Sequence, residues 1–175
     1  MYTSSAAERV QADLQQLFKA KLASGDAYLK LQLTSDVSTL LPMAWVEESR
    51  IVAAEAISPL PNMPSAVIGM TNSRDRVFCI FDLAQLLGLS AGSKAIRQYQ
   101  IAVLKTTAET PIHVGLSVME LQGIVRVGKE QIQTAHSGIE PNLIQFIVGV
   151  ATNSETPLPI LKFEQVLKKL QANGN

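Results

Sequence analysis

Few side chains in this sequence could take part in catalysis or hold a metal. The chain of 175 residues has two histidines, His113 and His136, and one cysteine, Cys79. These three residues lack the close spacing that metal ligands usually show, so a structural or solvent-exposed role is favoured for both histidines. Cys79 lies between Phe78 and Ile80 in an apolar run, which predicts a small buried hydrophobic side chain. We therefore expect neither a metal nor a cofactor.

The sequence also shows no pair of residues with the spacing that acid–base or nucleophilic catalysis needs. Glu47 and Glu48 are the one adjacent pair of acids, and neighbours on a strand point to opposite faces, so they cannot act together as acid and base. Ser117 is not in a Gly-x-Ser-x-Gly turn, and no glycine-rich phosphate loop is present. A small β-barrel enzyme or ligand-binding protein stays an alternative if a deep cleft joins His113 to Glu120. A third alternative is a structural subunit that only assembles with itself.

The composition favours a protein that binds other proteins. Charged residues make up 17% of the chain, below the roughly 25% of an ordinary soluble domain. Much of the surface must therefore be uncharged. Fifteen basic residues balance fifteen acidic ones, so there is no basic excess to neutralise the phosphates of a nucleic acid. A single cysteine suits the cytoplasm, the N-terminus lacks a signal-peptide pattern, and no apolar run reaches the ~20 residues of a membrane span.

These candidate residues must be positioned mostly by short strands. Residues 1–25 are expected to form an amphipathic helix, with one apolar stripe and a stop at Gly25. The period then changes to two at Leu29, Leu31 and Leu33, which predicts a half-buried strand. Further strands are expected from 39 to 43, 46 to 54, 67 to 70 and 77 to 81. Asp82 is expected to cap a short helix over 83–87.

The second half repeats this organisation after a small polar linker at residues 90–94. Strands are predicted at 99–105, 112–118, 121–127, 147–152 and 158–161, and an amphipathic helix at 164–170. Many short strands at regular spacing are typical of a sandwich or of barrels. We therefore expect a mainly β fold with a first lobe over 26–94, a second lobe over 95–175 and a C-terminal helix.

Several segments, in their order along the chain, resemble the CheW-like adaptor family. The segments that carry the resemblance are Leu41-Pro-Met-Ala-Trp-Val-Glu-Glu48, Ile57-Ser-Pro-Leu-Pro-Asn-Met-Pro64, Val67-Ile-Gly-Met-Thr-Asn-Ser-Arg-Asp-Arg-Val77, Ile80-Phe-Asp-Leu83, Lys129-Glu-Gln-Ile132 and Ile147-Val-Gly-Val-Ala151. The resemblance covers residues 26–171 as one domain. Ser73 and Asp75 depart from the leucine and glycine that usually flank Arg74. Details of the first two segments are similar to the cyanobacterial branch of PilI- and PixI-like proteins, tied to type IV pili and phototaxis.

The resemblance implies a fold and a function that the residues alone do not. It implies two SH3-like five-stranded β-barrels with a groove between them. It also implies a non-catalytic, cytoplasmic adaptor that couples a methyl-accepting receptor to the regulatory domain of a CheA-type histidine kinase. The residues that match the family's partner-binding motifs are Val46, Glu48, Asn72 and Arg74. Arg74 would lie at the tip of its turn, and Asn72 would also be able to bond its own turn.

Overall fold

The fold is mainly β. The computed structural model describes residues 24–90, 95–107, 109–134, 136–152 and 154–173, so the helix expected over residues 1–25 lies outside the described residues except at its end. The strands of the first half are β1 (Asp26–Gln32), β2 (Ser38–Pro42), β3 (Val46–Ala53), β4 (Val67–Ser73) and β5 (Arg76–Asp82). Those of the second half are β6 (Gln98–Lys105), β7 (His113–Val118), β8 (Glu120–Val127), β9 (Ile132–Gln133), β10 (Ile147–Ala151) and β11 (Leu158–Leu161).

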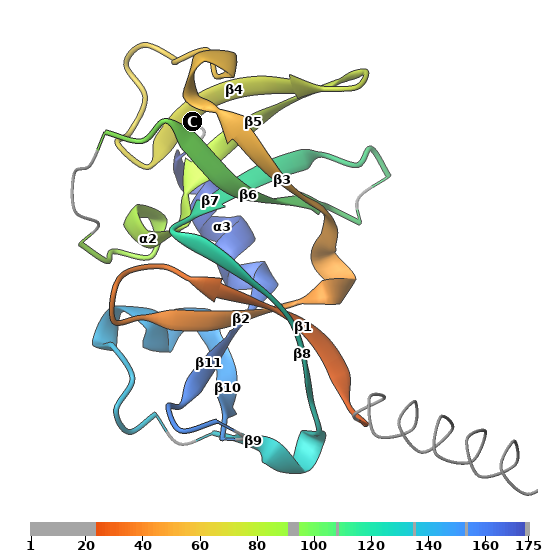
Figure 1. Ribbon diagram of the computed structural model, residues 1–175, viewed down its shortest axis with the longest axis vertical. Helices are drawn as coiled ribbons and strands as arrows, with labels where there is room; N and C mark the ends of the chain where they lie inside the picture. Colours follow the sequence, from red (N-terminus) through yellow and green to blue (C-terminus); the bar gives the residue numbers. More distant parts are fainter. Residues whose placement is uncertain (1–23, 91–94, 108, 135, 153, 174–175) are drawn as a thin grey trace, which may run out of the picture.

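Two curled sheets lie one above the other, with helix α3 (Phe163–Asn173) behind them (Figure 1). One sheet has the order β8-β1-β2-β11-β10-β9, and the other has the order β3-β6-β7-β5-β4. Each sheet therefore takes strands from both halves of the chain. The expected division into lobes 26–94 and 95–175 does not describe these sheets, because β1 and β2 pair with β8 and β11, whereas β6 and β7 pair with β3 and β5.

Among the described strands, two parallel pairings join the halves of the chain, and the other pairings are antiparallel. In one sheet Ile160 of β11 pairs with Leu40 of β2, and in the other Ile80 of β5 pairs with Gly115 of β7. Because these contacts lie far apart in the sequence, its local period of two carries no information about them. The sheet with six strands also exceeds the five implied by the resemblance, because the two-residue strand β9 adds to its edge.

The main core fills the space between the two sheets. Leu31 of β1, Leu104 of β6, Leu83 of the short helix α2 (Leu83–Leu86) and Val166 of α3 meet there, each at most 1% exposed. The predicted C-terminal helix is confirmed, and Val166 and Leu170 are its inward residues. Tyr28 corrects the expected half-buried pattern of β1: it is buried too, because the opposite face of that strand packs on a second, smaller cluster.

Two local features predicted from the first half of the sequence are also confirmed. The carboxylate of Asp82 accepts the backbone N–H of Gln85 at 3.1 Å, which confirms Asp82 as the cap of α2. The proline-rich segment 57–64 connects β3 to β4 without a helix or a strand of its own. At its start, the backbone of Ser58 exchanges two hydrogen bonds of 2.8 Å with Met70 of β4. This bridge brings the chain after one edge strand, β3, onto the other edge strand, β4, and so closes the curl of the sheet.

Candidate protein-interaction surface

The hairpin between β4 and β5 presents Arg74 at its tip. Ser73 pairs with Arg76, so Arg74 and Asp75 alone make the turn. Arg74 has a φ of 54°, a left-handed conformation that a non-glycine residue adopts at some cost in free energy. The side chain of Arg74 is exposed. The sequence therefore predicted the position of Arg74 correctly, although the strands extend further into the turn than expected.

Ser73, one of the departures from the family's pattern, has a structural explanation. It is 9% exposed and faces the inside of the curled sheet. Its hydroxyl lies 3.4 Å from Oε1 of Glu48 on β3 and donates to it, and Nη1 of Arg50 lies 3.7 Å from the same oxygen. A leucine at position 73 could not make this contact. The serine thus fits a polar interior at this end of the sheet.

The structure brings together two of the four predicted partner-binding residues. Glu48 and Arg74 line one shallow depression, together with Ser73, Arg76, Phe78, Val103 and His113. Val46 is separated from Glu48 by a bulge and packs against the main core instead. Asn72 lies on the outer side of β4 and is exposed, and its side chain makes no hydrogen bond with other described residues, so the bond that it could make to its own turn is absent there.

A polar cluster that the sequence did not predict lies beside this depression. Glu47 occupies the bulge of β3, and both of its carboxylate oxygens accept from Nη1 of Arg76, at 2.8 and 2.9 Å. Nε2 of His113 lies 2.6 Å from Oε2 of Glu47. The hydrogen bond from Arg76 holds the pKa of Glu47 below its ordinary value, and the nearby charges of His113 and Lys105 act in the same direction. No sequence signal revealed this cluster, because it depends on the bulge.

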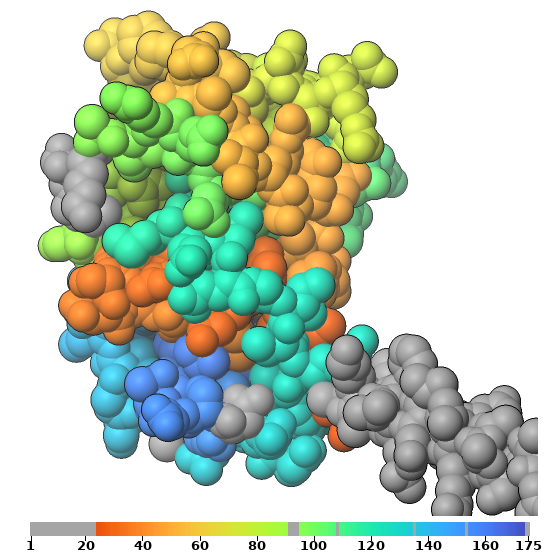
Figure 2. Space-filling model, viewed as in Figure 1, coloured from red at the N-terminus to blue at the C-terminus, as the bar shows by residue number. Residues whose placement is uncertain are grey.

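Edge strands β3 and β8 both reach the surface on the face drawn in Figure 2. Each carries an exposed apolar side chain: Ile51 of β3 is 63% exposed, and Ile124 of β8 is 62% exposed. The strand register places Ile51 and Ile124 on the same faces of their sheets as residues of the main core. The sheets are tied together here, since the side-chain oxygen of Gln100 accepts the backbone N–H of Leu121 at 2.8 Å. Exposed aliphatic residues at such an edge are typical of a protein-binding surface.

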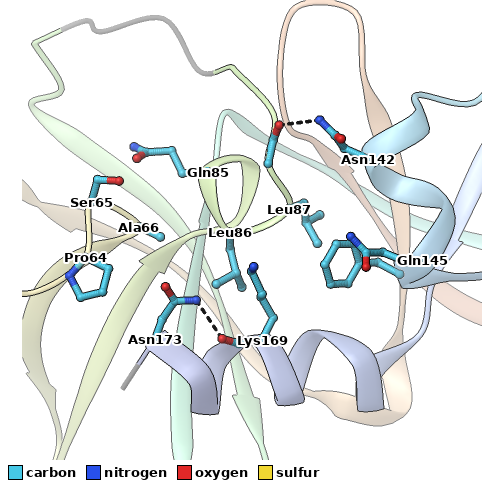
Figure 3. A pocket seen from close by; sticks show the side chains of 12 residues that line it. Pro64, Ser65, Ala66, Gln85, Leu86, Leu87, Asn142, Gln145, Lys169 and Asn173 are labelled. Atoms are coloured by element: carbon cyan, nitrogen blue, oxygen red, sulfur yellow. Dashed lines mark hydrogen bonds between the residues drawn. The ribbon is translucent and has the colours of Figure 1, made fainter. Parts of the chain in front are cut away.

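A separate cleft of about 230 Å³ lies between the proline-rich loop, α2, α3 and the 3-10 helix Pro141–Phe146 (Figure 3). Polar side chains such as Gln145 and Lys169 line it, and Lys169 is the one titratable residue among the described residues of its lining. Two of its amides are already used, because Asn142 donates to the carbonyl of Gly88 and Asn173 to that of Lys169. The part of the lining that the structure describes therefore offers no acid–base pair.

The arrangement that would have favoured an enzyme is not formed. His113 begins β7, whereas Glu120 follows its far end, so the two side chains share no cleft. Burial raises the pKa of the Cys79 thiol, which works against a thiolate nucleophile. Within the described residues, no three His, Cys, Asp or Glu side chains come together as a metal site. In the same part of the chain, no helix is long and apolar enough to cross a membrane.

These features define a class of protein: a two-sheet β domain whose notable surface features are a charged hairpin and an apolar edge. The CheW-like domain model matches residues 28–171, and the chain belongs to the CheW-like domain family. Among solved structures, the fold is similar to that of the scaffolding protein TtCheW from Thermoanaerobacter tengcongensis, with a TM-score of 0.66 and 17% sequence identity over 79% of this chain and 90% of that one. No curated protein sequence matches the chain.

Proposed function

We propose that this protein is a non-catalytic adaptor that couples a methyl-accepting receptor to the regulatory domain of a CheA-type histidine kinase. The observation that carries the proposal is membership of the CheW-like family over residues 28–171. The similar solved protein is described as a scaffolding protein. An adaptor of this kind needs surface for at least two partners and no reaction centre. It acts by holding the partners together, so that a signal at one shifts the equilibrium of the other.

The charged hairpin is the first of the two surfaces that we assign to partners. Arg74 is exposed and lies beside Glu48, so this end of the sheet presents both a fork of five N–H donors and a carboxylate. Such a pair can hold an acidic group and a basic group of one partner in a fixed register. We assign this surface to the cytoplasmic tip of the receptor. Asn72 extends it on the outer side of β4, and Val46 packs on the main core at the start of β3, before the bulge that leads to Glu48.

The apolar edge formed by Ile51 and Ile124 is the second surface. Both side chains are more than 60% exposed, and burying an aliphatic side chain of this size contributes about 2 kcal/mol. We assign this edge to an apolar segment of a partner, with the polar neighbours Gln100 and Gln122 as its rim. The curled sheets are consistent with the SH3-like barrels of the proposal, which would let adaptor and kinase pack barrel against barrel. We further propose a cytoplasmic location and a pathway of the pilus-motility or phototaxis type.

Size-exclusion chromatography with purified partners tests the adaptor proposal. The protein would be run alone, with its cognate kinase, with a receptor signalling fragment, and with both. An adaptor shifts to a larger species with each partner and forms a three-component peak with both. Self-assembly without a partner would favour a structural subunit, and a monomer that ignores both partners would contradict the proposal.

A further inference from the structure

Three charged or titratable side chains converge at one point on this molecule. Nε2 of His113 lies 2.6 Å from Oε2 of Glu47 and also 2.6 Å from Nη1 of Arg76. The three residues come from β7, β3 and β5, and in the sheet β6 and β7 lie between β3 and β5. The cluster therefore bridges strands that are not neighbours. It connects the bulged start of β3 directly to the first residue of β5 after the Arg74 turn.

A single imidazole nitrogen cannot satisfy both of these neighbours. A guanidinium has donors and no acceptor, so the contact with Arg76 requires an unprotonated Nε2 that accepts. An ionised carboxylate only accepts, so the contact with Glu47 requires a protonated Nε2 that donates. The neutral ring accepts from Arg76 in the tautomer that carries its proton on Nδ1, whereas the imidazolium has a proton on both nitrogens and therefore favours Glu47 and opposes Arg76. Histidine is the side chain that ordinarily changes charge between pH 5 and 8.

The charged groups around His113 leave a net positive charge, so a proton on His113 adds to the repulsion that Arg76 experiences. Lys105 of β6 is the cross-strand partner of His113. Arg74 and Glu48 line the adjoining depression, and Arg76 and Glu47 contact the ring. Arg50 lies 3.7 Å from Glu48, so four cations face two anions before His113 is counted. The side chain of His113 is 15% exposed, which leaves its contacts only partly screened by solvent.

We propose that Glu47, Arg76 and His113 form a proton-operated clamp between β3 and the Arg74 hairpin. With neutral His113 in the tautomer that carries its proton on Nδ1, Arg76 bonds both the ring and Glu47 and holds the hairpin against β3. With protonated His113, the imidazolium pairs with Glu47 and repels Arg76. Arg76 pairs with Ser73 across the turn, so its release alters how the neighbouring Arg74 is presented. The consequence for partner binding rests on the proposed adaptor function, whereas the clamp itself does not.

Proton NMR of the free, full-length protein tests the clamp directly. The chain has two histidines, and His136 is exposed in a loop, so its ring is an internal reference. Glu47→Gln removes the negative partner and is expected to lower the titration midpoint of His113 by at least about half a pH unit. Arg76→Gln removes the positive partner and is expected to raise that midpoint by a similar amount. The midpoint of His136 should not move in either variant.

The wild-type protein gives a second readout that needs no substitution. The side-chain Nε–Hε signal of Arg76 should shift with the same midpoint as the His113 ring, since both report one exchange of partners. An Arg76 signal that ignores the His113 titration, or a His113 midpoint that neither variant moves, would overturn the clamp. Equal movement of His136 would overturn it too, because the effect would then be global.

Binding at pH 6 and pH 8 tests the link to function separately. The wild-type protein is expected to bind a receptor signalling fragment at least about threefold differently at the two pH values, a difference of about 0.7 kcal/mol. A His113→Gln variant should show no such difference. If the NMR result supports the clamp but receptor-fragment binding is independent of pH, the clamp does not control binding. If the fragment does not bind at either pH, the proposed function fails while the NMR result still decides the clamp.

Discussion

The indole of Trp45 stacks on the ring of Phe163, with ring centroids 4.0 Å apart and planes 13° from parallel. Trp45 ends the short 3-10 helix by which the chain passes from β2 in one sheet to β3 in the other. Phe163 is the first residue of α3 and is 4% exposed. The stack therefore fixes the crossing between the sheets to the helix whose buried side chains join the main core.

Replacing the tryptophan should measurably weaken the fold. Trp45→Ala removes the stacked ring and leaves space beside Phe163, so we expect the free energy of unfolding to fall by about 2 to 3 kcal/mol. This loss is at or below the usual range for large aromatic residues because Trp45 is only partly buried. Urea denaturation followed by circular dichroism measures this. Trp45→Phe, which keeps a ring, should lose less than about 1 kcal/mol. Equal losses in the two variants would show that the stack contributes nothing specific.

The hairpin assignment predicts a loss of binding without a loss of folding. Arg74→Glu reverses an exposed charge at the turn, so we expect receptor binding to weaken by at least about tenfold, or 1.4 kcal/mol. The stability should change by less than about 0.5 kcal/mol. Arg97→Glu is the matched control, since Arg97 is also exposed but precedes β6 at the opposite end of the same sheet. Titration calorimetry that finds the same affinity for both variants would remove Arg74 from the surface.

The closure of the curled sheet depends on a close approach at Gly69. A Cβ atom at this position would lie 2.4 Å from the carbonyl oxygen of Ser58, next to the bridge between Ser58 and Met70. Gly69→Ala should therefore push the two segments apart and destabilise the protein by about 2 kcal/mol. Hydrogen exchange should accelerate at the Met70 amide. Asn72→Ala, on the exposed side of the same strand, should change neither quantity.

The Glu47 carboxylate should make stability depend on pH in the acid range. Its pKa is lowered from the ordinary 4.5, chiefly by the hydrogen bond from Arg76. A lowered folded-state pKa means that the contribution is fully present above about pH 4.5 and is lost as the pH falls through the lower value. Thermal unfolding between pH 6 and pH 3 should thus show a smaller decrease in melting temperature for Glu47→Gln than for the wild type. Parallel curves for the two proteins would contradict this assignment.

Local patterns in the sequence were enough to predict most of the elements. The strand expected at 158–161 is Leu158–Leu161, and the one expected at 99–105 begins one residue earlier, at Gln98. Both lie between turn signals and have buried faces, so the pattern and the tertiary structure agree. The cap at Asp82 was equally local. The two-residue strand β9 was missed because it is too short to show a period.

Long-range pairing and the bulge were beyond the reach of those patterns. Ile160 pairs with Leu40, more than a hundred residues away, and no property of either residue identifies its partner. Glu47 and Glu48 were expected to point to opposite faces of the strand, since adjacent strand residues alternate. The bulge between Val46 and Glu48 breaks that alternation and aims Glu47 at Arg76 and His113. The position of Arg74 was predictable because it depends only on its own turn.

The most direct test of the adaptor account is a reconstitution with receptor-containing membranes and the cognate kinase. Kinase autophosphorylation and the amount of kinase that sediments with the membranes would be measured with and without this protein. The account predicts that kinase sediments, and that its activity responds to the receptor, only when the wild-type protein is present, and that Arg74→Glu fails to substitute for it. Equal sedimentation and equal activity with and without the protein would contradict the account.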